Sequence, residues 1–226
     1  MLTTKQIRML VLLDNKIRVC KKCDLHNNGR CKPFYTKESR YAIIGEAPGS
    51  NEVRDNEPFT GAAGDILWET MADHGLEKDK FLIINSVNCR PVDENQSWKN
   101  GKPTEDQQDC CREWVRKYIR VFEPEKILVL GNYAMYSALG HGQGIMKLNA
   151  TIIDENQVNF ALAGTLGYDN APYVLSVHPA FCIYRKDEGL QMLSESIARF
   201  KEIEPPSPPM PDFVTDFLED EELWKI

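Results

Sequence analysis

Three polar side chains follow apolar runs in this sequence, and their types suit acid–base chemistry or recognition of a polar ligand. Glu46 follows YAIIG, Asn85 lies within FLIINSV, and His178 follows YVLSV. A carboxylate can act as a general base, an amide can read hydrogen-bonding groups, and an imidazole can donate a hydrogen bond. A single histidine is more often structural than catalytic, so a role for His178 requires a fold that brings it to the other two.

The segment GEAPGSNE (45–52) is a candidate phosphate loop because two glycines follow an apolar run. A P-loop needs a lysine followed by serine or threonine, and a dinucleotide fingerprint needs three spaced glycines. Neither pattern is present, and the acidic Glu46 would repel phosphate. We therefore interpret the loop as one that positions a carboxylate.

The seven cysteines offer a second kind of chemistry, and their spacing favours metal ligation. Cys20 and Cys23 form a CxxC after a predicted helix, whereas a redox CxxC lies between a strand and a helix. Cys111 belongs to an apolar helical stripe, but its neighbour Cys110 leads toward a polar face. The stripe contains Cys111, Trp114, Val115, Tyr118 and Phe122.

Cys89 directly follows an apolar run and completes a possible set of four thiolate ligands: Cys20, Cys23, Cys89 and Cys111. Four thiolates suit either an iron–sulfur cluster or structural zinc, and the residues alone leave both open. Cys31 and Cys182 are interpreted as unligated thiols. Such a site would attach the first helix to the rest of the fold.

The elements that must position these residues alternate along the chain. Short β-branched apolar runs suit buried parallel strands, and amphipathic segments separate them, which predicts an α/β/α sandwich with a four-stranded parallel sheet. Ligands of such sheets bind beyond the carboxyl ends of the strands, where Glu46, Asn85 and His178 would meet. The runs are 41–45, 81–87, 126–131 and 173–177, and the predicted helices are 4–19, 62–74, 104–122, 132–139 and 187–202.

In the first predicted helix, Ile7, Leu10, Val11 and Ile17 are expected to form the apolar stripe. Residues 145–170 are less regular and form either a hairpin or a long loop.

Composition bounds the function further. The chain has 226 residues, 42% of them hydrophobic, and a net charge of −7, of which residues from Glu204 onward contribute −6. The nearly neutral remainder therefore neither favours nor excludes DNA. No segment has the length and apolarity of a membrane span, so we expect an intracellular, cytoplasmic monomer, associated with the nucleoid if prokaryotic or viral.

We predict one domain over 1–203 and a Pro-rich acidic tail over 204–226. The tail is typical of disorder. Its alternative interpretation is a motif that binds a protein partner through Phe213, Phe217, Leu218 and Trp224.

The order of the motifs resembles the iron–sulfur uracil-DNA glycosylases, family 4 of the uracil-DNA glycosylase superfamily. Each motif alone is moderately specific, but seven in order over roughly residues 5–200 are strongly so. They are CKKCDL (20–25), GEAPGSNE (45–52), EPFTGAAGDIL (57–67), INSVNCRP (84–91), PTEDQQDCC (103–111), ILVLGNYA (127–134) and HPAF (178–181).

The resemblance implies cleavage of the N-glycosidic bond of uracil in DNA after the nucleotide leaves the base stack. It also implies a [4Fe–4S] cluster on Cys20, Cys23, Cys89 and Cys111, rather than zinc. Glu46 would orient or activate water, and His178 would stabilise charge on the departing base. The implied base contacts are Asn85, Phe59, the backbone of Ala47 and Glu52, and the implied DNA contacts are Phe181, Ile183, Tyr184 and Arg185.

Other interpretations of these residues stay open. Phe59 also suits core packing, Glu52 a helix or turn charge, and Asn85 a strand-end cap. The chain departs from the family where Asn149 and Ala150 replace a basic residue and a glycine, and the stretches 92–102 and 154–172 look longer or altered. A glycosylase for another modified base, or a catalytically weak DNA- or partner-binding scaffold, is therefore an alternative. No lysine stands in a motif suited to a Schiff base, which favours a monofunctional enzyme.

Overall fold

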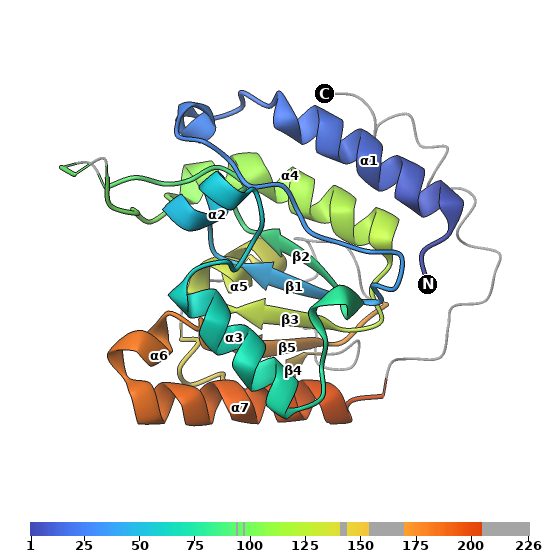
Figure 1. The fold of residues 1–226 in the computed structure, drawn as a ribbon, viewed down its shortest axis with the longest axis vertical. Coiled ribbons are helices and arrows are strands. Elements are labelled where there is room, and N and C mark those ends of the chain that lie inside the picture. Colours follow the sequence, from blue (N-terminus) through green and yellow to red (C-terminus); the bar gives the residue numbers. More distant parts are fainter. Residues whose placement is uncertain (94, 97, 141–143, 154–169, 205–226) are drawn as a thin grey trace.

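The computed structural model describes residues 1–93, 95–96, 98–140, 144–153 and 170–204. Figure 1 shows strands between two layers of helices, as expected for an α/β/α sandwich. The helices are α1 (Thr4–Arg18), α2 (Ser50–Asp55), α3 (Ala62–Asp73), α4 (Glu105–Phe122), α5 (Gly131–Leu139), α6 (Phe181–Tyr184) and α7 (Lys186–Glu202). The strands are β1 (Tyr41–Gly45), β2 (Phe81–Asn85), β3 (Ile127–Leu130), β4 (Ile152–Ile153) and β5 (Tyr173–Ser176).

The sheet has the order β2-β1-β3-β5-β4, and its first four strands are parallel. The residues of β2, β3 and β5 are all buried, because helices cover both faces of the sheet. The four predicted strands are therefore confirmed. A fifth, two-residue strand, β4, pairs antiparallel with β5 and lies in the region that the sequence left as hairpin or loop.

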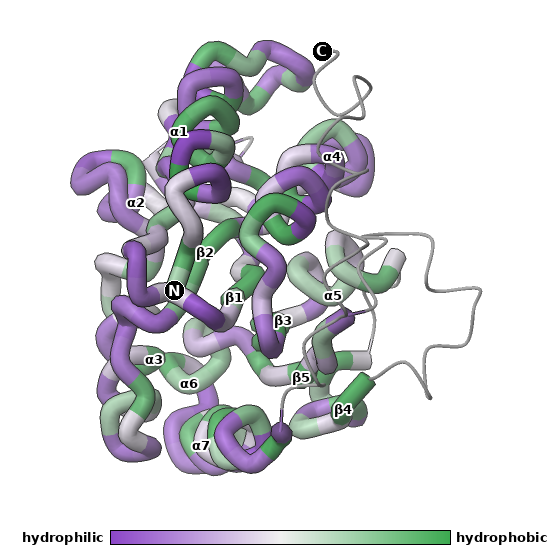
Figure 2. The backbone as a smooth tube through the Cα atoms, turned by 90° about the vertical axis from the view of Figure 1, so that its right-hand side faces the viewer, coloured by the Kyte–Doolittle hydropathy of each residue, from purple (hydrophilic) through white to green (hydrophobic). Residues whose placement is uncertain are grey.

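Two apolar cores fill the spaces between the layers. One contains residues of α1, α4 and α5 against the sheet, and the other contains residues of α3 and α7. Figure 2 shows the apolar strands between these helical layers. Every residue of the predicted α4 stripe is buried, because Cys111 and its partners recur on one helical face.

The helix boundaries follow local chemistry. Thr104 caps α4, as predicted, and forms a reciprocal capping box with Gln107. The predicted stripe of α1 is wrong at Val11, which is 46% exposed, while Met9 and Leu13 are buried. A residue next to Leu10 is rotated by about 100° around the helix, which turns Val11 away from α4, the helix against which α1 packs.

Two short helices, α2 and α6, were not predicted because they are too short to show a helical period. Within the described residues, no helix is both long and apolar enough to cross a membrane. The predicted tail lies outside the described residues beyond Glu204.

Candidate active site and cysteine cluster

The carboxyl ends of three parallel strands bring the predicted catalytic residues to one edge of the sheet. Asn85 is the last residue of β2 and pairs in register with Gly45, the residue before Glu46. His178 follows β5 by two residues, and β3 lies between β1 and β5. We refer to Glu46, Phe59, Asn85 and His178 as the catalytic edge.

Glu46 is a half-buried carboxylate that has no hydrogen-bond partner among the described residues. Burial raises its pKa to about 7, and the nearby charge of Lys102 opposes that rise. Tyr133 lies in the first turn of α5, and burial together with the charge of Glu46 raises its pKa. A carboxylate with this pKa accepts a proton readily near neutral pH.

His178 is held as a neutral imidazole with a defined tautomer. The backbone N–H of Ala180 donates to Nδ1 at 3.2 Å, so the ring proton lies on Nε2, which is left as a donor. Desolvation lowers the pKa of His178 to about 4. Gly131 leaves room for this ring, since a Cβ there would lie 3.0 Å from the His178 Cβ.

Asn149 supports the backbone next to His178, a role that the sequence did not predict. Its Oδ1 accepts from the N–H of Val177 at 3.0 Å and from the hydroxyl of Ser196 at 2.9 Å. Its Nδ2 donates to the carbonyl of Met192 on α7 at 2.9 Å. Asn149 was noted only as a departure from the family pattern, because these contacts join residues distant in sequence.

Phe59 and Asn85 meet over Gly45, the residue before Glu46. The Phe59 ring stacks on His178 with 6.0 Å between centroids and 29° between planes. Its backbone is left-handed at φ 56°, and Trp68 Nε1 donates to its carbonyl at 3.2 Å. The amide of Asn85 has no hydrogen-bond partner among the described residues, and a Cβ at Gly45 would lie 2.4 Å from its Oδ1.

Glu52 and Ala47 have local structural contacts as well as a place near the site. The Glu52 Oε2 accepts from the N–H of Gly49 at 3.0 Å and so caps α2. Ala47 packs against the cysteine cluster described below. The expectation of base contacts for these two residues stays a prediction.

The four predicted DNA-contacting residues lie in and after α6, next to His178. The Phe181 N–H donates to the His178 carbonyl at 2.8 Å, which connects α6 to His178. Ile183 and Tyr184 are 51% and 83% exposed, and Arg185 is exposed beside Glu188. These exposed side chains stay predicted DNA contacts.

Three of the predicted metal ligands pack in one small cluster. Cys89 and Cys111 are buried with Leu25 and Val87, and Cys23 packs against them. A hydrogen bond from Cys111 lowers the pKa of Cys23 to about 6. Cys20 is close enough for its charge to act on Cys89.

Hydrogen-bond donors point at these sulfurs. The backbone N–H of Leu25 donates to Cys23, and the backbone N–H of Asn88 donates to Cys111. The guanidinium of Arg30 donates to Cys89. Such donors stabilise metal-bound thiolates. Within the described ranges, no three Cys, His, Asp or Glu side chains are arranged to hold a single metal ion.

Of the remaining cysteines, Cys110 lies beside the CxxC segment, where the charges of Cys20 and Cys23 act on it. Cys110 directs its thiol toward the Lys22 carbonyl at 3.6 Å, consistent with its predicted orientation away from the apolar stripe. Cys31 and Cys182 are buried, and burial raises the pKa of Cys31 to about 12.

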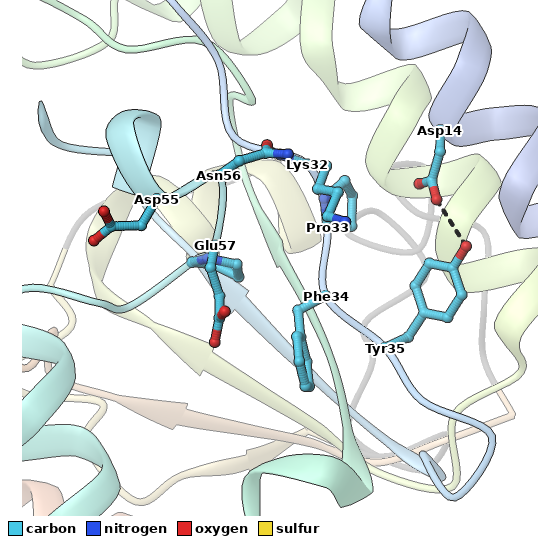
Figure 3. A pocket seen from close by; sticks show the side chains of 9 residues that line it. Asp14, Lys32, Pro33, Phe34, Tyr35, Asp55, Asn56 and Glu57 are labelled. Carbon is cyan, nitrogen blue, oxygen red and sulfur yellow. Dashed lines mark hydrogen bonds between the residues drawn. The ribbon is translucent and has the colours of Figure 1, made fainter. Parts of the chain in front are cut away.

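A separate pocket of about 440 Å³ lies between α1 and the segment after α2 (Figure 3). Tyr35 donates to Asp14 at one side, and Glu57 lies at the other. Its charged lining comprises three carboxylates and one lysine, which disfavours phosphate. It is lined by Asp14, Lys32, Pro33, Phe34, Tyr35, Asp55, Asn56, Glu57 and Pro58, none of which was predicted as a site residue.

A sequence profile of the Uracil DNA glycosylase superfamily matches residues 32–201. This match covers well over half of the chain and confirms the predicted resemblance. The chain belongs to the uracil DNA glycosylase superfamily.

Several similar proteins carry the name type-4 uracil-DNA glycosylase. That of Archaeoglobus fulgidus is 33% identical over 124 residues, which cover 53% of this chain and 58% of the relative. That of Thermotoga maritima is 28% identical over 150 residues, 65% of this chain and 74% of the relative. That of Sulfurisphaera tokodaii is 34% identical over 128 residues, which cover 54% of this chain and 55% of the relative. Two of these three matches thus span little more than half of the relative's length.

Proposed function

We propose that this chain hydrolyses the N-glycosidic bond of uracil in DNA after flipping the nucleotide out of the stack. The observation that carries the proposal is the catalytic edge, where a neutral histidine donor and an unpaired carboxylate of raised pKa follow parallel strands at the same end of one sheet. The names of the relatives support uracil as the base and DNA as the polymer.

The reaction separates opposite charges, and each side of the edge suits one of them. As the bond from the sugar C1′ to uracil N1 breaks, its electron pair leaves with the base and the sugar becomes positive. The Nε2–H of His178 would donate to a uracil carbonyl oxygen and stabilise the anion. The Glu46 carboxylate would face the positive sugar, orient a water molecule and take its proton as the oxygen joins C1′.

Recognition of the base would come from the other predicted site residues, beginning with Asn85 and Phe59. The free amide of Asn85 offers a donor and an acceptor to the polar edge of uracil, and the Phe59 ring would stack on the base. The Ala47 backbone and Glu52 would line the remaining side. The exposed side chains of α6 would contact the DNA next to the flipped nucleotide.

The donor set of the cysteine cluster fits a [4Fe–4S] cluster held by Cys20, Cys23, Cys89 and Cys111. Thiolate ligands from three segments and N–H groups directed at the sulfurs support this assignment. When bound, the cluster would join the end of α1, the segment after β2 and the start of α4. Because Ala47 packs on these cysteines, their arrangement supports the turn that carries Glu46.

The test is incubation of the purified protein with matched oligonucleotides that contain uracil, hypoxanthine or another modified base, followed by alkaline cleavage. We expect strand breaks at uracil and a loss of about 10²–10³-fold in rate for His178→Ala. If only a base other than uracil is released, that base replaces uracil as the proposed substrate. Absence of abasic product from every base would refute the glycosylase proposal.

A further inference from the structure

The described residues 91–93, 95–96 and 98–102, between β2 and α4, form a hairpin that the proposed mechanism does not use; we name it the Trp98 arm. Asn100 bridges Val92 in antiparallel fashion. The N–H of Asp93 donates to the Lys99 carbonyl at 3.1 Å, and the N–H of Gly101 donates to the Pro91 carbonyl at 3.0 Å. The arm projects at the end of the sheet where β2 ends (Figure 1).

Side-chain contacts hold the arm together and place Asn100 against the turn that follows β1. Arg90 donates from Nε to Asn100 Oδ1 at 2.7 Å and from Nη2 to the Trp98 carbonyl at 2.8 Å. The Asn100 amide lies against Gly49, since a Cβ there would be 2.8 Å from Asn100 Nδ2. The base of the arm carries Lys102, whose charge acts on Glu46. The arm is therefore joined to the turn that holds the catalytic carboxylate.

The tip of the Trp98 arm exposes an aromatic side chain and a cation to solvent. Trp98 is 72% exposed, and the ammonium of Lys99 lies 5.1 Å from the centre of its ring. Asp93 shapes the tip by accepting from the backbone N–H groups of Asn95 and Gln96 at 2.9 and 3.0 Å. The exposed indole contributes little to a core, although several contacts hold its backbone in place.

The strand order places this tip and α6 on opposite sides of the catalytic edge. The arm follows β2 at one side of the parallel sheet, α6 follows β5, and β1 with Glu46 lies between them. Tyr184, which is 83% exposed, is the counterpart of Trp98 on the α6 side. A strand of DNA with one nucleotide at Glu46 would extend toward both.

We propose that the Trp98 arm is a second DNA-binding element, in which the Trp98 ring stacks on an unpaired base beside the excised nucleotide and Lys99 contacts the phosphate backbone. An exposed aromatic next to a cation is the combination that binds single-stranded nucleic acid without sequence preference. The inference rests on the proposed function for its substrate. Because stacking needs an exposed base face, the arm favours single-stranded over duplex substrate.

The test compares Trp98→Ala and Trp98→Phe with Leu12→Ala, which removes an exposed apolar side chain from α1. We expect Trp98→Ala to raise KM for a single-stranded uracil oligonucleotide by about fivefold to a hundredfold, with kcat nearly unchanged. The increase should be smaller for duplex. Trp98→Phe should restore most of the affinity, and Leu12→Ala should behave as wild type.

A binding measurement keeps this proposal separate from the catalytic one. Tryptophan fluorescence is titrated with an uracil-free single-stranded oligonucleotide, and stacking should quench Trp98 emission in the wild type but not in Trp98→Phe. This assay does not require base excision, so it tests the arm even if no base is released. Equal quenching in wild type and Trp98→Phe, or an unchanged KM in Trp98→Ala, would overturn the proposal.

Discussion

The catalytic edge and the cysteine cluster lie at the same end of the molecule but are built differently. Glu46, Asn85 and His178 follow strands of one parallel sheet, and backbone pairing sets the spacing of those strands. The cysteines come from the end of α1, from a loop and from α4, which meet outside the sheet. The sheet can therefore position the first group by itself, whereas a bound group would complete the second.

Burial acts in the same direction in the two regions, but the neighbouring groups that oppose it differ. At the catalytic edge, burial raises the pKa of Glu46 and lowers that of His178, so it favours the neutral form of both. In the cysteine cluster, burial likewise raises the pKa of Cys89, and the pKa of Cys111 is raised by its hydrogen bond to Cys23 and by burial. The same hydrogen bond lowers the pKa of Cys23 to about 6. Burial of the ionisable Glu46 therefore costs stability at the edge, and a group bound by the cysteine cluster is expected to supply stability.

The sharpest separation of the two regions comes from Glu46→Gln. We expect excision to fall by about 10²–10⁴-fold, because the amide cannot take a proton from water. The same change should raise the free energy of unfolding at pH 8 by about 1–3 kcal/mol, because it removes a desolvated charge. Single-turnover kinetics and urea unfolding measure the two effects. A variant that loses both activity and stability would contradict this view of the edge.

The gain in stability depends on pH in a defined direction. Glu46 has its folded pKa raised to about 7 from an ordinary value of 4.5. The folded state therefore binds the proton more tightly, and this group's contribution to stability is lost as pH rises from 4.5 to 7. The advantage of Glu46→Gln should be near zero at pH 4.5 and constant above about pH 8.

Cys111→Ser probes the other region, with Cys110→Ser as the matched control on the adjacent residue. We expect Cys111→Ser to lose most of its bound iron and visible absorbance and more than about 4 kcal/mol of stability, with activity falling as a consequence. Cys110→Ser should keep its iron. Iron analysis, absorbance and thermal unfolding measure these effects, and equal iron in both variants would remove Cys111 from the ligand set.

The pH dependence of the wild type tests the edge without mutation. Since the ionised form of Glu46 is the base, excision under single-turnover conditions should rise about tenfold per pH unit below pH 7 and level off above it. His178, with a pKa of about 4, stays neutral throughout this range. A flat profile between pH 5 and 8 would exclude Glu46 as a base of this pKa.

Asn149→Ala tests how the fold orients His178. Loss of the acceptor for the Val177 N–H should lower kcat by about tenfold and change KM little, since misplacement acts on the reacting centre. Ser196→Ala removes only one other contact of Asn149 and should have a smaller effect. If kcat is unchanged while stability falls, Asn149 is structural only.

The smallest effect is expected at Ala150, the residue after Asn149. Its φ of 59° is left-handed, so Ala150→Gly should stabilise the protein by about 1 kcal/mol without changing activity. Ala198→Gly, inside α7, is the control and should destabilise by a similar amount. Thermal unfolding of both variants measures the contrast; destabilisation by Ala150→Gly would show that another contact requires the methyl group.

Much of the frame was predictable because local pattern and global fold agree. The four parallel strands and the buried face of α4 follow from short β-branched runs and a strict helical stripe. Val11, β4 and the short helices α2 and α6 were missed or wrong. The strand and the two helices are too short to show a period, and the exposure of Val11 depends on which face of α1 packs against α4.

The sequence by itself determined the types of reactive group and the strands that carry them, because the spacing of apolar runs specifies which side chains end each strand. Tertiary structure decided the chemical state of these groups. Burial shifts the pKa values of Glu46 and His178, Ala180 selects the tautomer of the histidine, and Asn149 holds the backbone beside it. These effects depend on neighbours brought together by folding, so no pattern along the chain contains them.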